Sequence, residues 1–449
     1  MPNLITTALS TLTVVLVTTL YFKTSIRRPP VAANGIPFLN HVLVFMKGQY
    51  FLGDMFQGLE NENAVEGAVM GRRMYVVRGG ENVRAVLGSS QLKMRGTGES
   101  SGGRLEKLRT LNTGLLFNSN VASWKQHRKL LVENIGRPRF IKSLIPKLNE
   151  YMNSLTPVLD ELADTLDVIM DVIFSEERNA AYQYVKDTLG SNDGEYPECD
   201  TMITTIHKFM DAQKYFTSTP PFLFNYVKLK ETRMHDASVD TFEKVITQRV
   251  HEKLESLQQE PQNTTNELDL ASALLLDPSP EMTPDRVISV IKEAVFGGQD
   301  TSSNTLAFIL YELSRNPSIA DAVHAEIADL QGPITETNIS RLKLVEAVIH
   351  ETSRLYNVAP TAIRYLSEDD GFVFVLMCEN HLRAGREEEV GPSGFGWNFA
   401  PFGYGVRKCP GESLALLEMK MVVAHLCKRY KFRLATDEPV KIKETFRRV

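Results

Sequence analysis

One cysteine lies in a glycine-rich loop within the stretch Phe402-Gly403-Tyr404-Gly405-Val406-Arg407-Lys408-Cys409-Pro410-Gly411. Apolar residues at helical spacing follow and predict a helix that begins near Glu412. The unpaired N–H groups and the dipole at a helix N-terminus favour a thiolate over a thiol, so Cys409 is a candidate ligand for a soft metal. The three glycines leave room beside the backbone for a flat cofactor, and Arg407 can present a planar charge to a carboxylate.

The spacing Phe-x-x-Gly-x-Arg-x-Cys-x-Gly resembles the haem-binding signature of the cytochrome P-450 superfamily, and all five anchor positions match. The chain is similar to the eukaryotic microsomal members, which are haem-thiolate monooxygenases. The resemblance implies haem b with an axial thiolate from Cys409, and it places Phe402, Arg407 and Gly411 against this cofactor. The alternative for a single cysteine is a small buried hydrophobic residue without a ligand role.

Composition sets broad limits on fold and partners. The 449 residues are 43% hydrophobic, and the formal net charge of −5 gives no indication of nucleic-acid binding. Four cysteines without a C-x-x-C pair favour a reducing compartment, with neither a disulfide framework nor a zinc site. The cysteines are Cys199, Cys378, Cys409 and Cys427.

The N-terminal stretch Leu4 to Phe22 carries no charge and is long enough, as a helix, to span the apolar part of a bilayer. A cleaved signal peptide is the alternative, but the basic n-region typical of one is missing. Lys23, Arg27 and Arg28 follow the stretch instead, which predicts a cytosolic location for everything downstream. We therefore expect a membrane anchor at 1–28, a haem domain at 29–449, and single-pass residence in the endoplasmic reticulum membrane with the catalytic domain in the cytosol.

Periodicity predicts a mostly α fold with a small β portion (α+β). Short apolar runs such as Gly67 to Met70 and Tyr75 to Val77 predict strands, and helical patterns dominate beyond about Glu81. Between Cys199 and Leu257 we expect two helical stretches around Pro220-Pro221, rich in aromatic residues. The resemblance makes this region the roof of the substrate site, near the membrane.

A second cluster lies on the helix that Asn118-Ser119-Asn120 is expected to cap. Trp124 and Arg128 are four residues apart and share one helix face. By themselves they indicate a cation–π contact at the surface. The superfamily has the same Trp-x-x-x-Arg, and the resemblance implies that both side chains bind a haem propionate.

The longest predicted helix begins after Thr283-Pro284 and ends at Arg315. Two adjacent glycines, Gly297 and Gly298, interrupt its middle and cost about 2 kcal/mol relative to alanine. They indicate either a close helix crossing or space for a ligand, in which case Thr301 can bond to the Gly297 carbonyl. The sequence Gly-Gly-x-Asp-Thr resembles the superfamily's oxygen-activation motif, which implies catalytic roles for Asp300 and Thr301 in proton delivery.

Three further charged residues take roles from the resemblance. Glu351 and Arg354 match a Glu-x-x-Arg pair that is buried behind the haem, and Arg364 lies in a strand expected to bring a guanidinium to a propionate. Beyond Arg364 the chain departs from the pattern. The region from Gly371 to Phe402 lacks the usual Pro-x-Arg-Phe segment, and the part after Leu434 is short, as in a faulty gene model or an inactive copy.

The expected activity is insertion of one oxygen atom of O2 into an apolar small molecule, with electrons from NADPH through a flavin reductase. Basic residues around the cysteine loop are candidates for the reductase-binding face or are simply solvated. The alternatives are a haem-thiolate isomerase or dehydratase that needs no reductase, and a family member that holds no haem. The basic residues are Lys125, Lys129, Lys408, Lys420, Lys428 and Arg429.

Overall fold

The computed structural model describes most of the chain from residue 29 to residue 434. The described residues are 29–32, 55–59, 61–69, 72–89, 93–94, 107–109, 114–116, 118, 120–155, 202–218, 223–227, 229–259, 269–279, 282–330, 332–365, 372–376 and 399–434. The expected anchor, Leu4 to Phe22, lies outside them. Among the helices that the structure does describe, none is both long and apolar enough to cross a bilayer.

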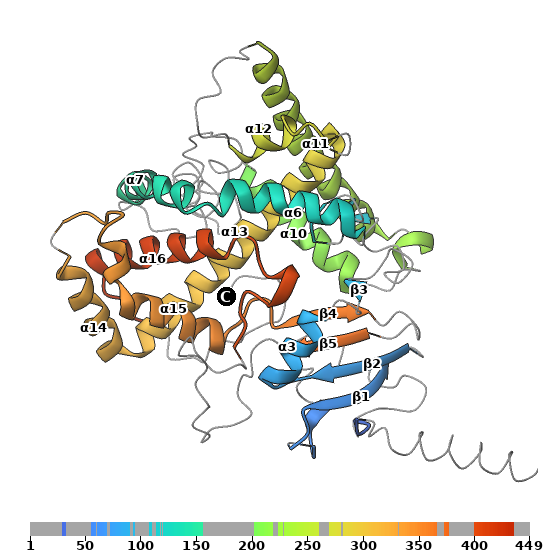
Figure 1. Cartoon of the computed structure of the whole chain (residues 1–449), viewed down its shortest axis with the longest axis horizontal. Helices are drawn as coiled ribbons and strands as arrows, with labels where there is room; N and C mark the ends of the chain where they lie inside the picture. The colour runs from blue at the N-terminus through green and yellow to red at the C-terminus, as the bar shows by residue number, and fades with distance from the viewer. Residues whose placement is uncertain are drawn as a thin grey trace, which may run out of the picture.

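Five strands form one sheet beside the helical part of the molecule (Figure 1). They are β1 (Ala64–Val69), β2 (Arg72–Val77), β3 (Lys93–Met94), β4 (Thr361–Tyr365) and β5 (Phe372–Leu376). The strand order is β1-β2-β5-β4-β3, and β5 pairs parallel with β2 and antiparallel with β4. The sheet thus joins the expected early strands to segments about 300 residues later, in the register Met74 with Phe372.

Helices make up most of the remaining described structure, which confirms the expected mostly α fold. They are α3 (Gly80–Gly88), α6 (Val121–Ile135), α7 (Pro138–Leu155), α10 (Met202–Ser218), α11 (Lys230–Gln259), α12 (Leu270–Leu275), α13 (Pro284–Arg315), α14 (Pro317–Ala328), α15 (Lys343–Leu355) and α16 (Glu412–Arg429). Short helical turns are η2 (Leu223–Val227), η3 (Ile339–Arg341) and η4 (Gly405–Arg407). The predicted helix pair around Pro220-Pro221 corresponds to α10 and α11.

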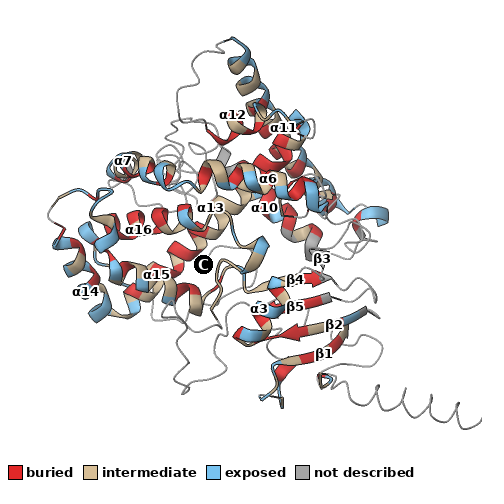
Figure 2. Cartoon of the chain, viewed as in Figure 1, coloured by how far each residue is buried: buried red, intermediate tan, exposed pale blue. Residues whose placement is uncertain are grey.

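Helix α13 is the central element of the helical part. It packs against α11, α12, α14, α15 and α16, and its residues from Val287 to Glu293 are buried on every side. Figure 2 shows buried residues on the inward faces of the surrounding helices. A helix buried all round must be apolar almost all round, so the charged residues of α13 at these positions, Lys292 and Glu293, require specific partners.

Candidate functional site

The cysteine loop is closed by its own backbone. The Cys409 N–H donates to the Phe402 carbonyl at 2.8 Å, and the Lys408 N–H donates to the Gly405 carbonyl at 3.1 Å. Gly405 has φ 72°, in the left-handed region, and a Cβ there would lie 2.6 Å from the Leu87 carbonyl oxygen of α3. Glycine is therefore required at this position for its conformation and for the contact with α3. The loop delivers Cys409 to the start of α16.

Cys409 is exposed as a residue, although protein closely surrounds its thiol group. Burial raises the pKa of the Cys409 thiol, and a hydrogen bond from the Gly411 N–H opposes this effect, as do the charges of Arg128 and Lys408. The helix N-terminus favours the thiolate as expected through the Gly411 N–H, but burial outweighs this contribution and the pKa of the thiol is raised. The donor set nevertheless fits a metal-bound thiolate, since a thiol releases its proton to solvent when its sulfur binds a metal, and an N–H donor then stabilises the sulfur.

Trp124 lies closer to Arg407 than to Arg128, the partner predicted from the sequence. The guanidinium carbon of Arg407 lies 3.8 Å from the centre of the Trp124 ring, whereas that of Arg128 lies 5.9 Å away. Trp124 is 4% exposed. Burial lowers the pKa of Arg128, and Cys409 raises it, which places this guanidinium within electrostatic range of the sulfur. Helix α6 and the cysteine loop thus bring Trp124, Arg128, Arg407 and Cys409 together.

Arg364 enters from the sheet. It lies on β4, is 3% exposed, and donates from Nη1 to the carbonyl of its neighbour Ile363 at 3.0 Å. A buried guanidinium requires polar partners to offset its lost hydration. Its place on β4 matches the predicted strand.

The middle of α13 has the predicted bond between a hydroxyl and the backbone. Thr301 Oγ1 donates to the Gly297 carbonyl at 2.6 Å, and a Cβ added at Gly297 would meet nothing within 4 Å. Open space beside Gly297 favours the ligand interpretation of this glycine over a tight helix crossing. Burial raises the pKa of Asp300 to about 7, against a hydrogen bond from Asn304 that lowers it. Asp300 therefore titrates near neutral pH.

Glu351 and Arg354 form the expected pair but not in the expected place. Arg354 Nε and Nη2 donate to the two Glu351 oxygens at 2.8 and 2.7 Å. The side chains are 54% exposed for Glu351 and 38% exposed for Arg354. The prediction of a buried pair is wrong, because both residues lie on the face of α15 opposite to its buried Val345 and Ile349. The sequence between Gly371 and Phe402 has no Pro-x-Arg-Phe segment. Most of that region, residues 377–398, lies outside the described residues.

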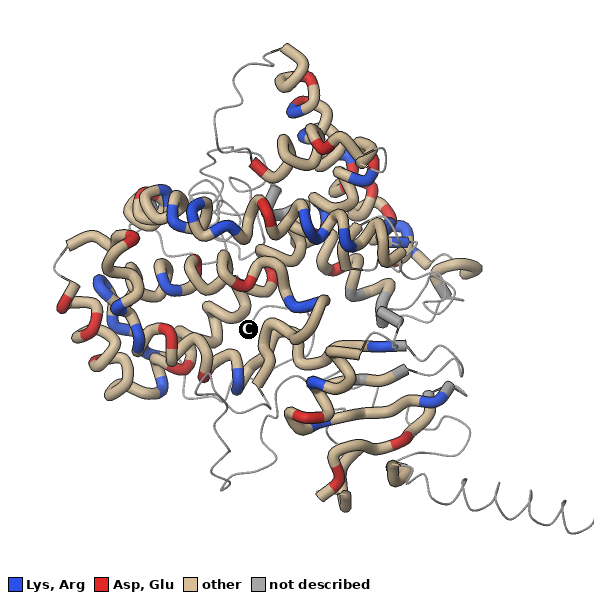
Figure 3. Tube along the Cα trace, in the orientation of Figure 1, with Lys and Arg blue, Asp and Glu red and all other residues tan. Residues whose placement is uncertain are grey.

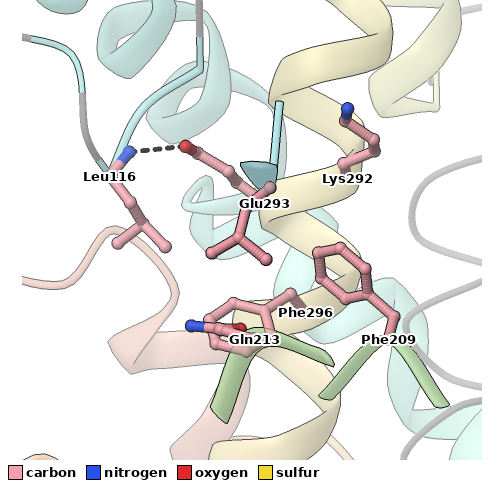
Figure 4. Close-up of a pocket in the computed structure, with 7 residues that line it drawn as sticks. Leu116, Phe209, Gln213, Lys292, Glu293 and Phe296 are labelled. Atoms are coloured by element: carbon pink, nitrogen blue, oxygen red, sulfur yellow. Dashed lines mark hydrogen bonds between the residues drawn. The ribbon is translucent and has the colours of Figure 1, made fainter. Parts of the chain in front are cut away.

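A small cavity between α10 and α13 has a polar wall that sequence reasoning missed (Figure 4). Its volume is about 10 Å³, room for one water molecule. Lys292 is 2% exposed and donates to the Arg109 carbonyl at 3.1 Å, with the Glu243 carboxylate at 3.3 Å. The Glu293 carboxylate accepts the backbone N–H groups of Leu115 and Leu116. The cavity is lined by Leu108, Leu116, Phe209, Gln213, Lys292, Glu293 and Phe296.

The family model described as cytochrome P450 matches residues 29–374 and 391–448. The chain belongs to the cytochrome P450 family. The internal gap in this match, residues 375–390, falls inside the region where the sequence departs from the family pattern. Members of this family bind haem b through a cysteine thiolate and are oxidoreductases of the monooxygenase class. The fold agrees, since the haem domain of a cytochrome P450DA mutant superposes with TM-score 0.73 at 17% identity, over 94% of this P450 and 95% of that chain.

Curated relatives of this P450 include hydroxylases. Rat mitochondrial sterol 26-hydroxylase is 33% identical over 186 residues, which is 34% of each protein. Human mitochondrial 25-hydroxyvitamin D-1 alpha hydroxylase is 32% identical over 177 residues, 34% of this chain and 35% of that enzyme. Cytochrome P450 4d8 of Drosophila melanogaster is 26% identical over 52% of this chain and 58% of its own length. The match thus spans about a third of the length of the hydroxylases.

Proposed function

We propose that this P450 is a haem-thiolate monooxygenase that inserts one oxygen atom of O2 into an apolar small molecule. The observation that carries the proposal is the Cys409 sulfur, which accepts the Gly411 N–H at the start of α16 and lies near the charge of Arg128. When bound, haem b supplies the iron at which dioxygen is reduced. The remaining roles belong to residues of the chain.

Cys409 would supply the thiolate that binds the haem iron, and four side chains would hold the propionates. Trp124 would donate its indole N–H, while Arg128, Arg364 and Arg407 would provide guanidinium donors in a planar geometry that suits carboxylates. Phe402 is half-buried against the core and would limit water near the sulfur. The N–H of Gly411 fits a thiolate partner because its donation favours charge on the sulfur.

Asp300 and Thr301 would deliver protons on the α13 side. With a pKa of about 7, Asp300 is a proton donor and acceptor near physiological pH. Thr301 Oγ1 uses its hydrogen toward Gly297, so passing a proton requires the hydroxyl to rotate away from that carbonyl. The open side of Gly297 provides space for a small reactant beside this hydroxyl.

The substrate is proposed to be apolar and of moderate size. Leu108, Leu116, Phe209 and Phe296 line the small cavity, and Phe296 lies one position before Gly297 on α13. A cavity of about 10 Å³ accepts no such substrate until side chains move. The hydroxylase names among the relatives support a sterol-like molecule as the first compound to test.

Electrons are proposed to come from NADPH through a flavin reductase that binds exposed positive charge on α6 (Figure 3). Lys125 and Lys129 are exposed there, and Lys129 is 4.0 Å from Glu133. Lys420 does not fit this role, because its side chain is 15% exposed and pairs with Glu346 at 2.9 Å. Reversing Lys125 and Lys129 to glutamate should slow reduction in a salt-dependent way; equal rates would remove the docking proposal.

We also propose membrane attachment in the endoplasmic reticulum, with the anchor at 1–28 and the haem domain at 29–449. Tyr226 of η2 is 85% exposed and Val227 is 53% exposed, an apolar pair that suits contact with lipid near the substrate roof. The alternative location is the mitochondrion, because several relatives are named as mitochondrial proteins. Fractionation with protease protection decides, because a microsomal protein is digested from the cytosolic side whereas a mitochondrial one is protected.

Spectroscopy and turnover test the proposed activity. The reduced holoprotein under carbon monoxide should show the Soret band of thiolate ligation, and Cys409→Ser should lose it. Turnover should require NADPH with a reductase. Activity with a hydroperoxide alone would instead favour the isomerase or dehydratase alternative, and a chain that takes up no haem would overturn the enzyme assignment.

A further inference from the structure

Glu293 of α13 is hydrogen-bonded to a loop that also holds the arginine of the cysteine loop. We define the bridging loop as residues 114–116 and 118. The Glu293 carboxylate accepts the N–H groups of Leu115 and Leu116, and Figure 4 shows the second of these bonds. A Cβ at Gly114 would overlap the same carboxylate, so the loop approaches α13 as closely as a glycine permits.

The other side of the bridging loop contacts Arg407. Arg407 Nη1 donates to the Leu115 carbonyl at 3.2 Å, and Nη2 donates to the Asn118 carbonyl at 2.9 Å. The Leu115 carbonyl and the Leu116 N–H belong to one peptide unit. That unit therefore donates to a carboxylate and accepts from a guanidinium at the same time. Each bond polarises the peptide in the direction that strengthens the other.

Buried side chains hold the bridging loop in this position. Asn118 is fully buried and donates from Nδ2 to the Gly114 carbonyl at 3.0 Å. The His127 ring, also fully buried, lies 3.2 Å from the same carbonyl through Nδ1. The loop is thus connected to α6 as well as to α13 and the cysteine loop, and a shift in Glu293 would move the carbonyls that receive Arg407.

We propose that Glu293 is a positioning residue for Arg407, acting through the peptide between Leu115 and Leu116. Glu293 thereby couples the helix of Asp300 and Thr301 to the loop of Cys409. The consequence for haem rests on the proposed function, in which Arg407 binds a propionate. A glutamate is suited to this position because one carboxylate oxygen can accept two N–H groups and its charge strengthens both bonds.

The experiment uses the full-length holoprotein and the variants Glu293→Gln and Glu293→Asp. Gln keeps the shape but loses the charge, and Asp keeps the charge but shortens the reach. Hydrogen–deuterium exchange at the amides of Leu115 and Leu116 should rise about tenfold in both variants. The control Asp285→Asn removes a charge from an exposed position on the same helix and should leave exchange at these amides unchanged. Unchanged exchange in both Glu293 variants would show that Glu293 does not hold the bridging loop, and would overturn the proposal.

The coupling to Arg407 is tested by a double-mutant cycle with Arg407→Lys. Each single variant should release haem about tenfold faster, and Glu293→Gln with Arg407→Lys should be no faster than either alone. Additive effects would show that Glu293 and Arg407 act separately and overturn the proposal. If the wild type retains no haem, the proposed function fails, and the same cycle is then read from thermal unfolding midpoints, where non-additivity still supports the link.

Discussion

The guanidinium of Arg407 lies over the indole ring of Trp124, with its central carbon 3.8 Å from the ring centre. Trp124 is almost fully buried, so the stacked charge is partly removed from water and the contact is stronger than a surface pair. The same guanidinium donates to the carbonyls of Leu115 and Asn118. One side chain therefore joins α6, the bridging loop and the cysteine loop.

Arg407→Lys should destabilise the protein even without haem. Lysine retains the charge but cannot donate to two carbonyls in a fixed fork while stacking flat on an indole. We expect a loss of about 2 kcal/mol in the free energy of unfolding, measured by chemical denaturation of the apoprotein. Lys125→Arg, at an exposed position of α6, is the control and should cost almost nothing. Equal stabilities of Arg407→Lys and wild type would contradict a stabilising role for the contact between Arg407 and Trp124.

Asp300→Asn should flatten the pH dependence of turnover. Burial raises the pKa of Asp300 to about 7, so the side chain loses its proton as pH rises through neutrality. If the protonated form supplies protons, turnover of the wild type falls above pH 7. The variant should be slower by about a hundredfold, and its rate should not fall in this pH range. Steady-state rates from pH 6 to 8.5 measure both features.

Stability should respond to Asp300 in a defined direction. Its folded-state pKa is raised above the unfolded value of 3.8, so the native state binds a proton more tightly. The stabilisation is complete below the unfolded pKa and is lost as pH rises through about 7. Asp300→Asn should therefore gain unfolding temperature relative to wild type at pH 8 but not at pH 4. A difference of the opposite sign would disprove the raised pKa.

Gly297→Ala should stabilise the fold and impair substrate use. The added Cβ meets no atom within 4 Å, so the helical backbone gains about 1 kcal/mol from the replacement of glycine. The methyl group occupies the open side of α13, where we place a small reactant. Thermal unfolding and substrate-induced spectral titration should move in opposite directions.

Gly405→Ala provides the contrasting case. Its Cβ would collide with the Leu87 carbonyl at 2.6 Å, and φ is 72°. We expect a loss of more than about 2 kcal/mol in stability. Similar unfolding temperatures for the two alanine variants would contradict the difference in their surroundings.

Glu243→Gln should destabilise the protein by weakening the contact between α11 and α13. Glu243 pairs with the buried Lys292 at 3.3 Å and with Arg109 at 3.1 Å. Without its acidic partner the buried ammonium is more costly, and we expect a loss of about 2 to 3 kcal/mol in unfolding free energy by denaturant titration. Glu252→Gln on the same helix breaks an exposed pair with Arg249 and should cost below about 0.5 kcal/mol. Equal losses would contradict the role assigned to burial.

Local sequence signals predicted the elements that carry the chemistry. The predicted helix from Thr283-Pro284 to Arg315 agrees with the bounds of α13 at both ends, although Thr283 makes no side-chain cap bond. Asn120 caps α6 through Oδ1 as predicted. These signals succeed because caps and prolines act on neighbouring residues in the chain. The bond from Thr301 to Gly297 was predictable for the same reason, since it spans one helical turn.

Contacts between distant segments were not predictable in this way. Glu293 binds backbone N–H groups almost 180 residues earlier, and backbone groups leave no residue-type pattern to match. Arg407 stacks on Trp124 because of how the loop folds, and neither residue's neighbours indicate it. The exposure of Glu351 and Arg354 was missed because spacing shows that two residues meet but not which face of the helix is buried.

The parallel ladder between β2 and β5 has a consequence for biosynthesis. A ribosome releases residues 72–77 long before 372–376, so β2 can pair early with β1, but its edge that pairs with β5 stays unmatched while most of the polypeptide is made. During that interval the nascent amino-terminal part is a natural client for chaperones. Truncated translation products that end before β5 would be expected to aggregate.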